Sequence, residues 1–245
     1  MFPIRDHNPS QRRPLVTYAL IGLNVLVFLS YVSLFGDARA LNEFFYTWGL
    51  VPAWVGEVPG TMLTSMFLHG GFMHLAGNML FLWVFGDNME DRMGHVGFLA
   101  FYLAGGLGAA AIQILADPAS TIPMVGASGA IAAVLGGYLL LFPKARVDVL
   151  FFFVVIIRVV PIPAAFVLGA WFGIQILGGL GAPSDEGGVA YWAHTGGFAA
   201  GLLLTLPVWL RLGGPAFWRR TQGHPAHPEA HYRWQRTGVP RVPRR

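Results

Sequence analysis

The chain has 245 residues, of which 55% are hydrophobic and only 11% charged. Its mean hydropathy of +0.56 excludes an ordinary soluble domain and predicts a membrane protein. The absence of cysteine excludes thiol catalysis, disulfides and cysteine-ligated metals. The pI near 9.8 is no sign of nucleic-acid binding, because the basic residues lie at the ends of apolar runs and in a tail, where membrane topology explains them.

Apolar runs divide the chain into a short N-terminal segment, a membrane domain and a tail, at residues 1–14, 15–210 and 211–245. A spanning helix takes about 20 residues, and six uncharged runs are long enough. They are Leu15–Phe35, Val58–Gly86, Met93–Ala116, Pro118–Pro143, Val159–Ser184 and Gly187–Leu210. The first run is longer than the apolar core of a cleaved signal peptide, so we expect it to be retained. The predicted fold is an all-α, polytopic bundle of six transmembrane helices.

One further apolar stretch, Val149–Ile157, is too short to span as a helix. We expect it to lie at the membrane interface or to lead into the fifth span.

Basic residues orient the bundle. If the N-terminus is inside, the outer segments hold a single basic residue, Arg39, as the positive-inside rule requires. An odd number of spans would put the arginine-rich tail outside. We therefore predict a multi-pass protein of the cell (plasma or inner) membrane with both termini in the cytoplasm.

The tail, residues 211–245, combines Pro, His and Arg without apolar periodicity, so we expect it to be disordered and to face anionic lipid. We expect its histidines to be solvated and not to form a metal site; they are His224, His227 and His231. At the opposite side, the first outer loop is rich in aromatic residues, which we interpret as an interfacial belt and not as a binding surface. They are Phe44, Phe45, Tyr46, Trp48 and Trp54.

The motif Gly126-Ala127-Ser128-Gly129 places a serine at the head of an apolar run. Most serines in such runs only pack or bond the carbonyl one turn back, and for the motif alone this is the more frequent explanation. The small neighbours, however, leave the hydroxyl uncovered. A helix that begins here would also direct unpaired N–H groups at an approaching group. This arrangement suits a nucleophile.

Histidine and asparagine are costly inside a membrane and usually face the interior of a bundle. His74 and Asn78 are four residues apart, which places them on one helix face. His69 and His74 are five apart with no Glu between them, so the zinc motif HExxH is absent. We predict no metal and no cofactor, and we interpret His69 as a loop-end residue that bonds the backbone.

His194 lies one turn before Gly197, and Gly197 and Gly201 form a small-residue face that allows another helix to approach closely. The helix that packs there faces His194, and the glycine-lined Ser128 is the natural partner. In the predicted topology His74, Ser128 and His194 all lie near the outer ends of their spans. The outer halves of the spans contain no Asp or Glu to orient the histidine, so we predict a Ser–His dyad.

From Leu15 to Leu210 the chain resembles the rhomboid intramembrane serine proteases in their six-helix prokaryotic form. The resemblance rests on the segments His69-Gly-Gly-Phe-Met-His74-Leu-Ala-Gly-Asn78, Glu90-Asp-Arg92 and Gly126-Ala-Ser128-Gly129, and on His194 with Gly197 and Gly201. It implies that Ser128 is the nucleophile and His194 the general base. It also implies that His74, Asn78 and the Ser128 amide form the oxyanion hole.

Other positions match or depart from that family's pattern. Glu90 and Arg92 look like its structural clamp at the inner side, and Gly126, Gly129, Gly197 and Gly201 belong to its structural motifs. Many members place an aromatic residue four positions after the serine, where this chain has Ala132. Many also carry a Trp-Arg pair in the first outer loop, which this chain lacks.

The expected activity is hydrolysis of a peptide bond in or near the outer end of transmembrane segments, in single-span membrane proteins held in the same lipid bilayer. A catalytically silent relative that only binds transmembrane clients is the alternative. A transporter is disfavoured, because the sequence shows neither inverted repeats nor buried carboxylates. The sequence makes no prediction of oligomeric state.

Overall fold

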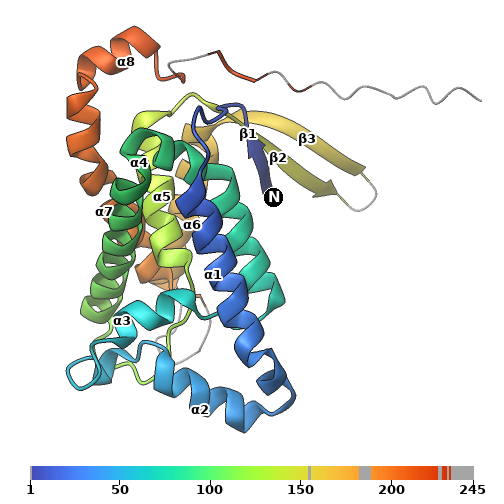
Figure 1. The fold of residues 1–245 in the computed structure, drawn as a ribbon, viewed down its shortest axis with the longest axis vertical. Helices are drawn as coiled ribbons and strands as arrows, with labels where there is room; N and C mark the ends of the chain where they lie inside the picture. The colour runs from blue at the N-terminus through green and yellow to red at the C-terminus, as the bar shows by residue number, and fades with distance from the viewer. Residues whose placement is uncertain (1, 154–155, 182–188, 226–227, 231, 233–245) are drawn as a thin grey trace, which may run out of the picture.

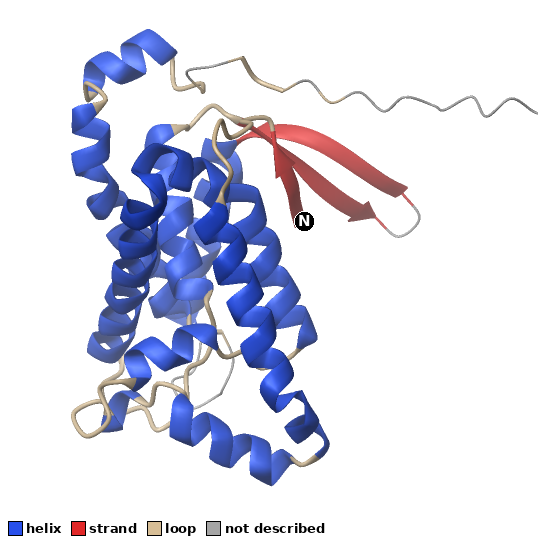
Figure 2. Ribbon diagram, viewed as in Figure 1, coloured by secondary structure: helices blue, strands red, loops and turns tan. Residues whose placement is uncertain are grey.

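The computed structural model describes residues 2–153, 156–181, 189–225, 228–230 and 232. It shows a bundle of helices with a small sheet at one end (Figures 1 and 2). The helices are α1 (Leu15–Tyr31), α2 (Ala38–Trp48), α3 (Thr61–Thr64), α4 (Phe72–Ala116), α5 (Ser128–Leu141), α6 (Ala164–Gly181), α7 (Tyr191–Arg211) and α8 (Pro215–Thr221), with 3-10 turns at Val32–Gly36, Pro52–Trp54 and Ser65–Phe67. The strands are β1 (Phe2–Asp6), β2 (Arg146–Phe153) and β3 (Ile156–Pro163).

Four helices among the described residues are long and apolar enough to cross a membrane: α1 with its 3-10 extension, α4, α6 and α7. The chain is therefore a multi-pass membrane protein, although helix length does not confirm the predicted count of six. The fourth predicted span, Pro118–Pro143, is helical only in the 14 residues of α5. Its first part is a loop whose backbone pairs with another loop, through the bridge between Leu50 and Met124, and so cannot join the helix.

The 45-residue helix α4 contains the third predicted span and residues 72–86 of the second, whose first part, residues 58–71, forms α3, a 3-10 turn and loops. A straight helix of that length would be about twice as long as the hydrocarbon core is thick. Gly94 interrupts it with φ +73° and ψ 166°, a conformation that glycine adopts far more readily than other residues. The segments 72–93 and 95–116 on either side of Gly94 both cross the bundle (Figure 1).

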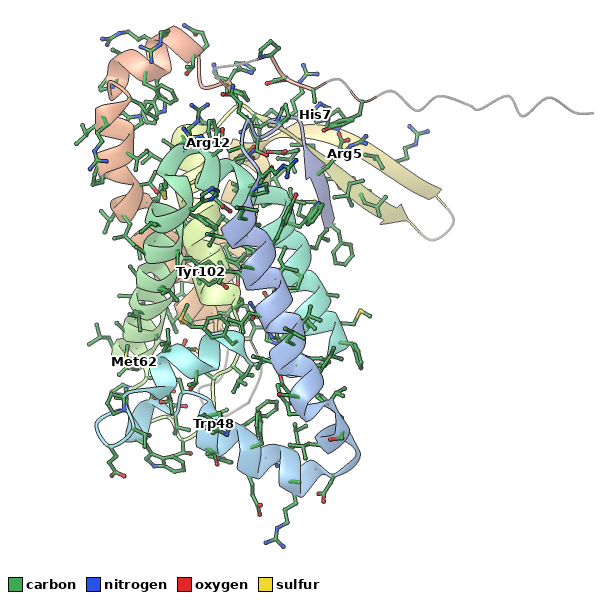
Figure 3. The ribbon with its side chains drawn as sticks, in the orientation of Figure 1. Arg5, His7, Arg12, Trp48, Met62 and Tyr102 are labelled. Atoms are coloured by element: carbon green, nitrogen blue, oxygen red, sulfur yellow. The ribbon has the colours of Figure 1, made fainter. Side chains whose placement is uncertain are left out.

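The centre of the bundle is α5, which packs between α4 and α7. Its residues from Gly129 to Tyr138 are all buried, as expected for a helix that is apolar on every side. Beside it, Tyr102 of α4 lies in the middle of the bundle (Figure 3) and is fully buried. The first residue of this central helix is Ser128, so the packing of α5 sets the position of the predicted nucleophile.

The sheet corrects the all-α prediction. Strands β1, β2 and β3 form an antiparallel sheet in that order, in which Phe2 pairs with Leu150 and Asp6 with Val147. The segment Val149–Ile157, expected at the interface or leading into the fifth span, forms part of strands β2 and β3, and β3 leads directly into α6. The Val, Ile and Phe residues of β2 and β3 favour strands, while Pro161 disfavours a helix there.

Part of the tail is also ordered, contrary to the predicted disorder. Phe217 of α8 is 1% exposed, and the Trp218 indole N–H donates to the Leu140 carbonyl at 2.9 Å. These two residues pack against the end of the bundle. The composition of the tail does not predict this contact. His227, His231 and residues 233–245 lie outside the described residues.

Glu90 and Arg92, predicted to be a structural clamp, contact different partners. The Glu90 carboxylate, 2% exposed, accepts from the Val16 and Thr17 amides at 2.9 and 2.8 Å and from the Thr17 hydroxyl at 2.7 Å. It therefore caps the start of α1, whose N-terminal N–H groups lack intrahelical acceptors. The Arg92 guanidinium instead lies 5.4 Å from the centre of the Phe142 ring.

The two ends of the bundle differ in residue type. Figure 3 places Arg5, His7 and Arg12 at the end that carries the sheet, and Trp48 at the opposite end. We call these the sheet end and the α2 end. At the α2 end, Phe44 and Phe45 pack their rings against Tyr31 with centroids 4.7 and 6.0 Å away, so these two members of the predicted belt are packing residues.

Candidate active site

Ser128 and His194 are in hydrogen-bond contact. The distance between Ser128 Oγ and His194 Nε2 is 2.7 Å, although the residues are 66 positions apart in the sequence. Ser128 opens α5 and His194 lies in the first turn of α7. Both side chains are half-buried, so they are within reach of an entering group.

Glycine packing brings these two helices together. A Cβ atom on Gly197 would lie 2.1 Å from the Gly129 carbonyl oxygen, and one on Gly201 would lie 2.0 Å from that of Ala133. Real Cβ atoms do not approach backbone so closely, so only glycine fits at either position. The predicted packing of this glycine face against the serine helix is confirmed.

His74 and Asn78 of α4 lie on the other side of the serine. A Cβ atom on Gly126 would lie 2.9 Å from His74 Nε2 and 3.4 Å from Ser128 Oγ. Glycine, which has φ +136° here, carries no Cβ, so only its backbone lies between the imidazole and the hydroxyl. The Gly70 amide donates to His74 Nδ1 at 3.3 Å, which leaves the proton on Nε2, the ring nitrogen on the side of Gly126.

Asn78 adds a second donor on this side. Its Nδ2 is buried without a hydrogen-bond partner among the described residues, and Asn78 lines the same cavity as Ser128. A buried amide without a partner is unusual and calls for a functional explanation. The Ser128 amide, at the first helical position, also has no intrahelical acceptor. Three residues with available N–H groups, His74, Asn78 and Ser128, thus line the cavity that contains the hydroxyl.

These groups share one cavity of about 770 Å³. Its wall includes Ser128, His194, His74 and Asn78, and also Met62, which lies towards the α2 end in Figure 3. The cavity is therefore in the half of the bundle away from the sheet. Within the part of the chain that the structure describes, no group of three or more His, Asp or Glu side chains is arranged to hold a metal ion.

The sequence analysis missed two residues of α6 that contact His194. Gln175 Oε1 lies 2.7 Å from His194 Nδ1, and the Trp171 ring lies 5.7 Å from the imidazole, tilted by 36°. Ala132, where the resemblance suggested an aromatic, is fully buried against α7, so Trp171 lies beside the histidine instead. The available signal was a lone amide in an otherwise apolar span.

Two other polar residues support the site. Gln113 Oε1 accepts from the Ala193 amide at 3.1 Å, which holds the start of α7. The backbone of His69 bonds the Tyr31 hydroxyl at 2.7 and 3.0 Å, and its ring packs edge-on against His74 at 5.2 Å. The sequence predicts that His69 is a loop-end residue that bonds the backbone; it does lie at the end of a loop, just before α4, but its hydrogen bonds join its own backbone to a tyrosine side chain. The ring nitrogens have no partner among the described residues.

Comparison with known proteins identifies the family. Residues 58–211 match the family model described as Rhomboid domain. The chain is 32% identical over 195 residues to Rhomboid protein 1, mitochondrial, of Saccharomyces cerevisiae, an alignment that covers 77% of this chain and 51% of the relative. It is 37% identical over 78 residues to RHOMBOID-like protein 5 of Arabidopsis thaliana, covering 32% of this chain and 25% of the relative.

A third similarity is to the human Presenilin-associated rhomboid-like protein, mitochondrial, at 34% identity over 92 residues, covering 37% of this chain and 24% of the relative. The chain thus spans about half of the yeast relative and about a quarter of the other two. The matched Rhomboid domain extends over most of the helix bundle and includes His74, Ser128 and His194. On this evidence, the chain belongs to the rhomboid family.

Proposed function

We propose that the protein is an intramembrane serine endopeptidase that cuts transmembrane segments of single-span membrane proteins in or near their outer ends. The observation that carries the proposal is the 2.7 Å contact between Ser128 Oγ and His194 Nε2 in a cavity lined by free N–H donors. No separate cofactor enters this chemistry.

The geometry supports acyl transfer through a serine ester. Ser128 Oγ attacks the scissile carbonyl carbon while His194 Nε2 takes the hydroxyl proton. The carbonyl oxygen becomes an oxyanion, which the Ser128 amide, His74 Nε2–H and Asn78 Nδ2–H stabilise. When the C–N bond breaks, the imidazolium returns the proton to the leaving amine. Water then attacks the acyl-serine by the same route and releases the new carboxylate.

The topology that goes with this proposal has six spans: α1, the two parts of α4, α5, α6 and α7. We propose that the sheet end faces the cytoplasm, with both termini, and that the protein resides in the cell (plasma or inner) membrane. The arginines at the sheet end support this orientation. The cavity then opens towards the outer face, where water is available as a reactant.

A serine-reactive fluorophosphonate and a single-span membrane substrate test the proposal together. We expect the purified protein in proteoliposomes to be labelled on Ser128 and to cleave the substrate, with both activities lost in Ser128→Ala. A wild-type protein that binds the substrate segment but neither cleaves it nor reacts with the probe would instead support a catalytically silent, client-binding protein.

A further inference from the structure

One polar side chain in α6 faces the Ser128–His194 pair. Gln175 is the only amide in a helix otherwise made of Ala, Phe, Val, Leu, Gly, Trp and Ile. It is 7% exposed, whereas Ile174 and Leu177 on the same helix are 58% and 71% exposed. An amide that leaves water for an apolar environment is costly unless it finds hydrogen-bond partners. Its two partners therefore define how Gln175 is held.

Those partners fix which way the amide points. Gln175 Nε2 donates to the Trp171 carbonyl one turn back at 3.4 Å, and Oε1 faces His194 Nδ1 at 2.7 Å. A backbone carbonyl only accepts. The reversed amide would therefore place its oxygen against the Trp171 oxygen, which is repulsive. The oxygen of Gln175 is the atom that faces the imidazole.

This orientation decides the tautomer of His194. Because Oε1 only accepts, Nδ1 carries the ring proton, and the lone pair of Nε2 points at the Ser128 hydroxyl 2.7 Å away. A neutral imidazole acts as a general base through the nitrogen that lacks a proton. Among the described residues, Gln175 and Ser128 are the only hydrogen-bond partners of this ring.

Aromatic packing holds α6 in the position that this bond requires. The Trp171 ring lies beside His194 with centroids 5.7 Å apart. Phe172 stacks on Phe198 of α7 with centroids 4.4 Å apart. The amide, the indole and the imidazole are therefore placed by one contact between α6 and α7.

We infer that Gln175 is a positioning residue that holds His194 in the base-competent tautomer, so that Ser128, His194 and Gln175 form one hydrogen-bonded chain supplied by α5, α7 and α6. This inference rests on the proposed protease function. It assigns to a neutral amide the role that a buried carboxylate fills in soluble serine proteases. The neutral group avoids placing a charge inside the membrane, where ionised side chains are costly.

Three variants test the inference in the full-length protein. Gln175→Met keeps an unbranched side chain of similar length but removes the acceptor, whereas Gln175→Glu keeps an acceptor oxygen. Leu177→Met is the matched control, because it makes a similar change on the exposed face of the same helix. We would measure kcat and KM on a single-span substrate, the rate of fluorophosphonate labelling of Ser128, the melting temperature, and the 15N shifts of the His194 ring.

For Gln175→Met we expect kcat and the labelling rate to fall by roughly 10- to 100-fold, a part of the about 10²–10⁴ that general acid–base catalysis supplies. KM and the melting temperature should stay close to those of wild type. Gln175→Glu should recover most of the lost rate, and Leu177→Met should behave as wild type. The 15N shifts should report a proton on Nδ1 in wild type and a shift of the population towards Nε2–H in Gln175→Met.

Labelling of Gln175→Met at the wild-type rate would overturn the inference while leaving the protease function intact. A loss of kcat that follows the melting temperature and is not recovered by Gln175→Glu would also overturn it, because that pattern indicates packing. If wild type neither cleaves nor reacts with the probe, the proposed function fails. The 15N shifts then still decide whether Gln175 sets the tautomer.

Discussion

Ser128 and His194 interact through single atoms, so each is expected to be indispensable. We predict that Ser128→Ala and His194→Ala each abolish cleavage of a membrane substrate and leave the helix bundle folded, as judged by circular dichroism and melting temperature in detergent. Neither side chain belongs to the buried core, which is why the fold should persist. Wild-type cleavage by either purified variant would exclude the proposed mechanism.

Asn78 should be less critical than the serine and histidine. Removing one oxyanion donor typically costs about 10²–10³ in turnover, and in Asn78→Ala the Ser128 amide and His74 remain. We predict a loss of about 10²-fold in kcat, with measurable residual activity in the same assay. A loss as complete as that of Ser128→Ala would mean that Asn78 has a further role in the reaction.

At the sheet end, a single carboxyl group should make stability depend on pH. Burial raises the pKa of Asp6 well above its usual value, and the nearby Asp87 acts in the same direction. The folded state therefore binds the proton more tightly than the unfolded chain does. This contribution to stability is complete below the unfolded pKa near 4 and is lost as the pH rises through the folded pKa.

We predict that the melting temperature of wild type falls relative to that of Asp6→Asn as the pH is raised from about 4 to about 8. The asparagine keeps an acceptor for the Tyr138 hydroxyl, which donates to Asp6 at 2.6 Å, but it does not titrate. The difference between the two proteins isolates Asp6 from the other ionisable groups. Parallel curves for the two proteins would show that Asp6 does not have this effect.

Among the helices, the contact between α5 and α7 is the one on which the site depends. We predict that Gly201→Leu lowers both the melting temperature and the cleavage rate, because its side chain must displace the Ala133 backbone and so separate Ser128 from His194. Overpacking of this kind typically costs about 1–3 kcal/mol. Gly169→Leu in α6 is the control, since a Cβ there meets nothing within 4 Å. A fully stable and active Gly201→Leu would disprove this dependence.

For the whole molecule, the enclosed site restricts which substrates react. A transmembrane helix has its carbonyls bonded to its own N–H groups, so it must unwind before Ser128 can attack. We predict that segments with Gly or Pro near their outer ends are cut there, after a small residue such as Ala, and that the same segments with Leu resist. Mass spectrometry of the products maps the cut. Cleavage in the inner half, or cleavage undiminished by the Leu changes, would contradict control by local unwinding.

Much of the helical architecture and the central pair of the site follow from sequence alone. Apolar runs too long for a soluble domain predict the membrane bundle. The small residues around Ser128 and at Gly197 and Gly201 predict the close contact between α5 and α7. These inferences succeed because helix period and residue size are local properties of the sequence. A row of glycines on one helix face also predicts that another helix packs against that face.

Tertiary structure alone decided the rest. Residues 2–6 pair with residues 146–153, although nothing in either segment identifies the other as its partner. Strand pairing over such a sequence distance depends on where the helix bundle places the two segments. Glu90 binds the start of α1 and not Arg92, since residues two apart on a helix do not face each other, and only the packing of α1 against α4 brings the α1 amides to this carboxylate. As the lone amide of an apolar span, Gln175 is expected to face the bundle interior, but the sequence does not identify its partner. Only the packing of α6 on α7 turns its amide towards His194.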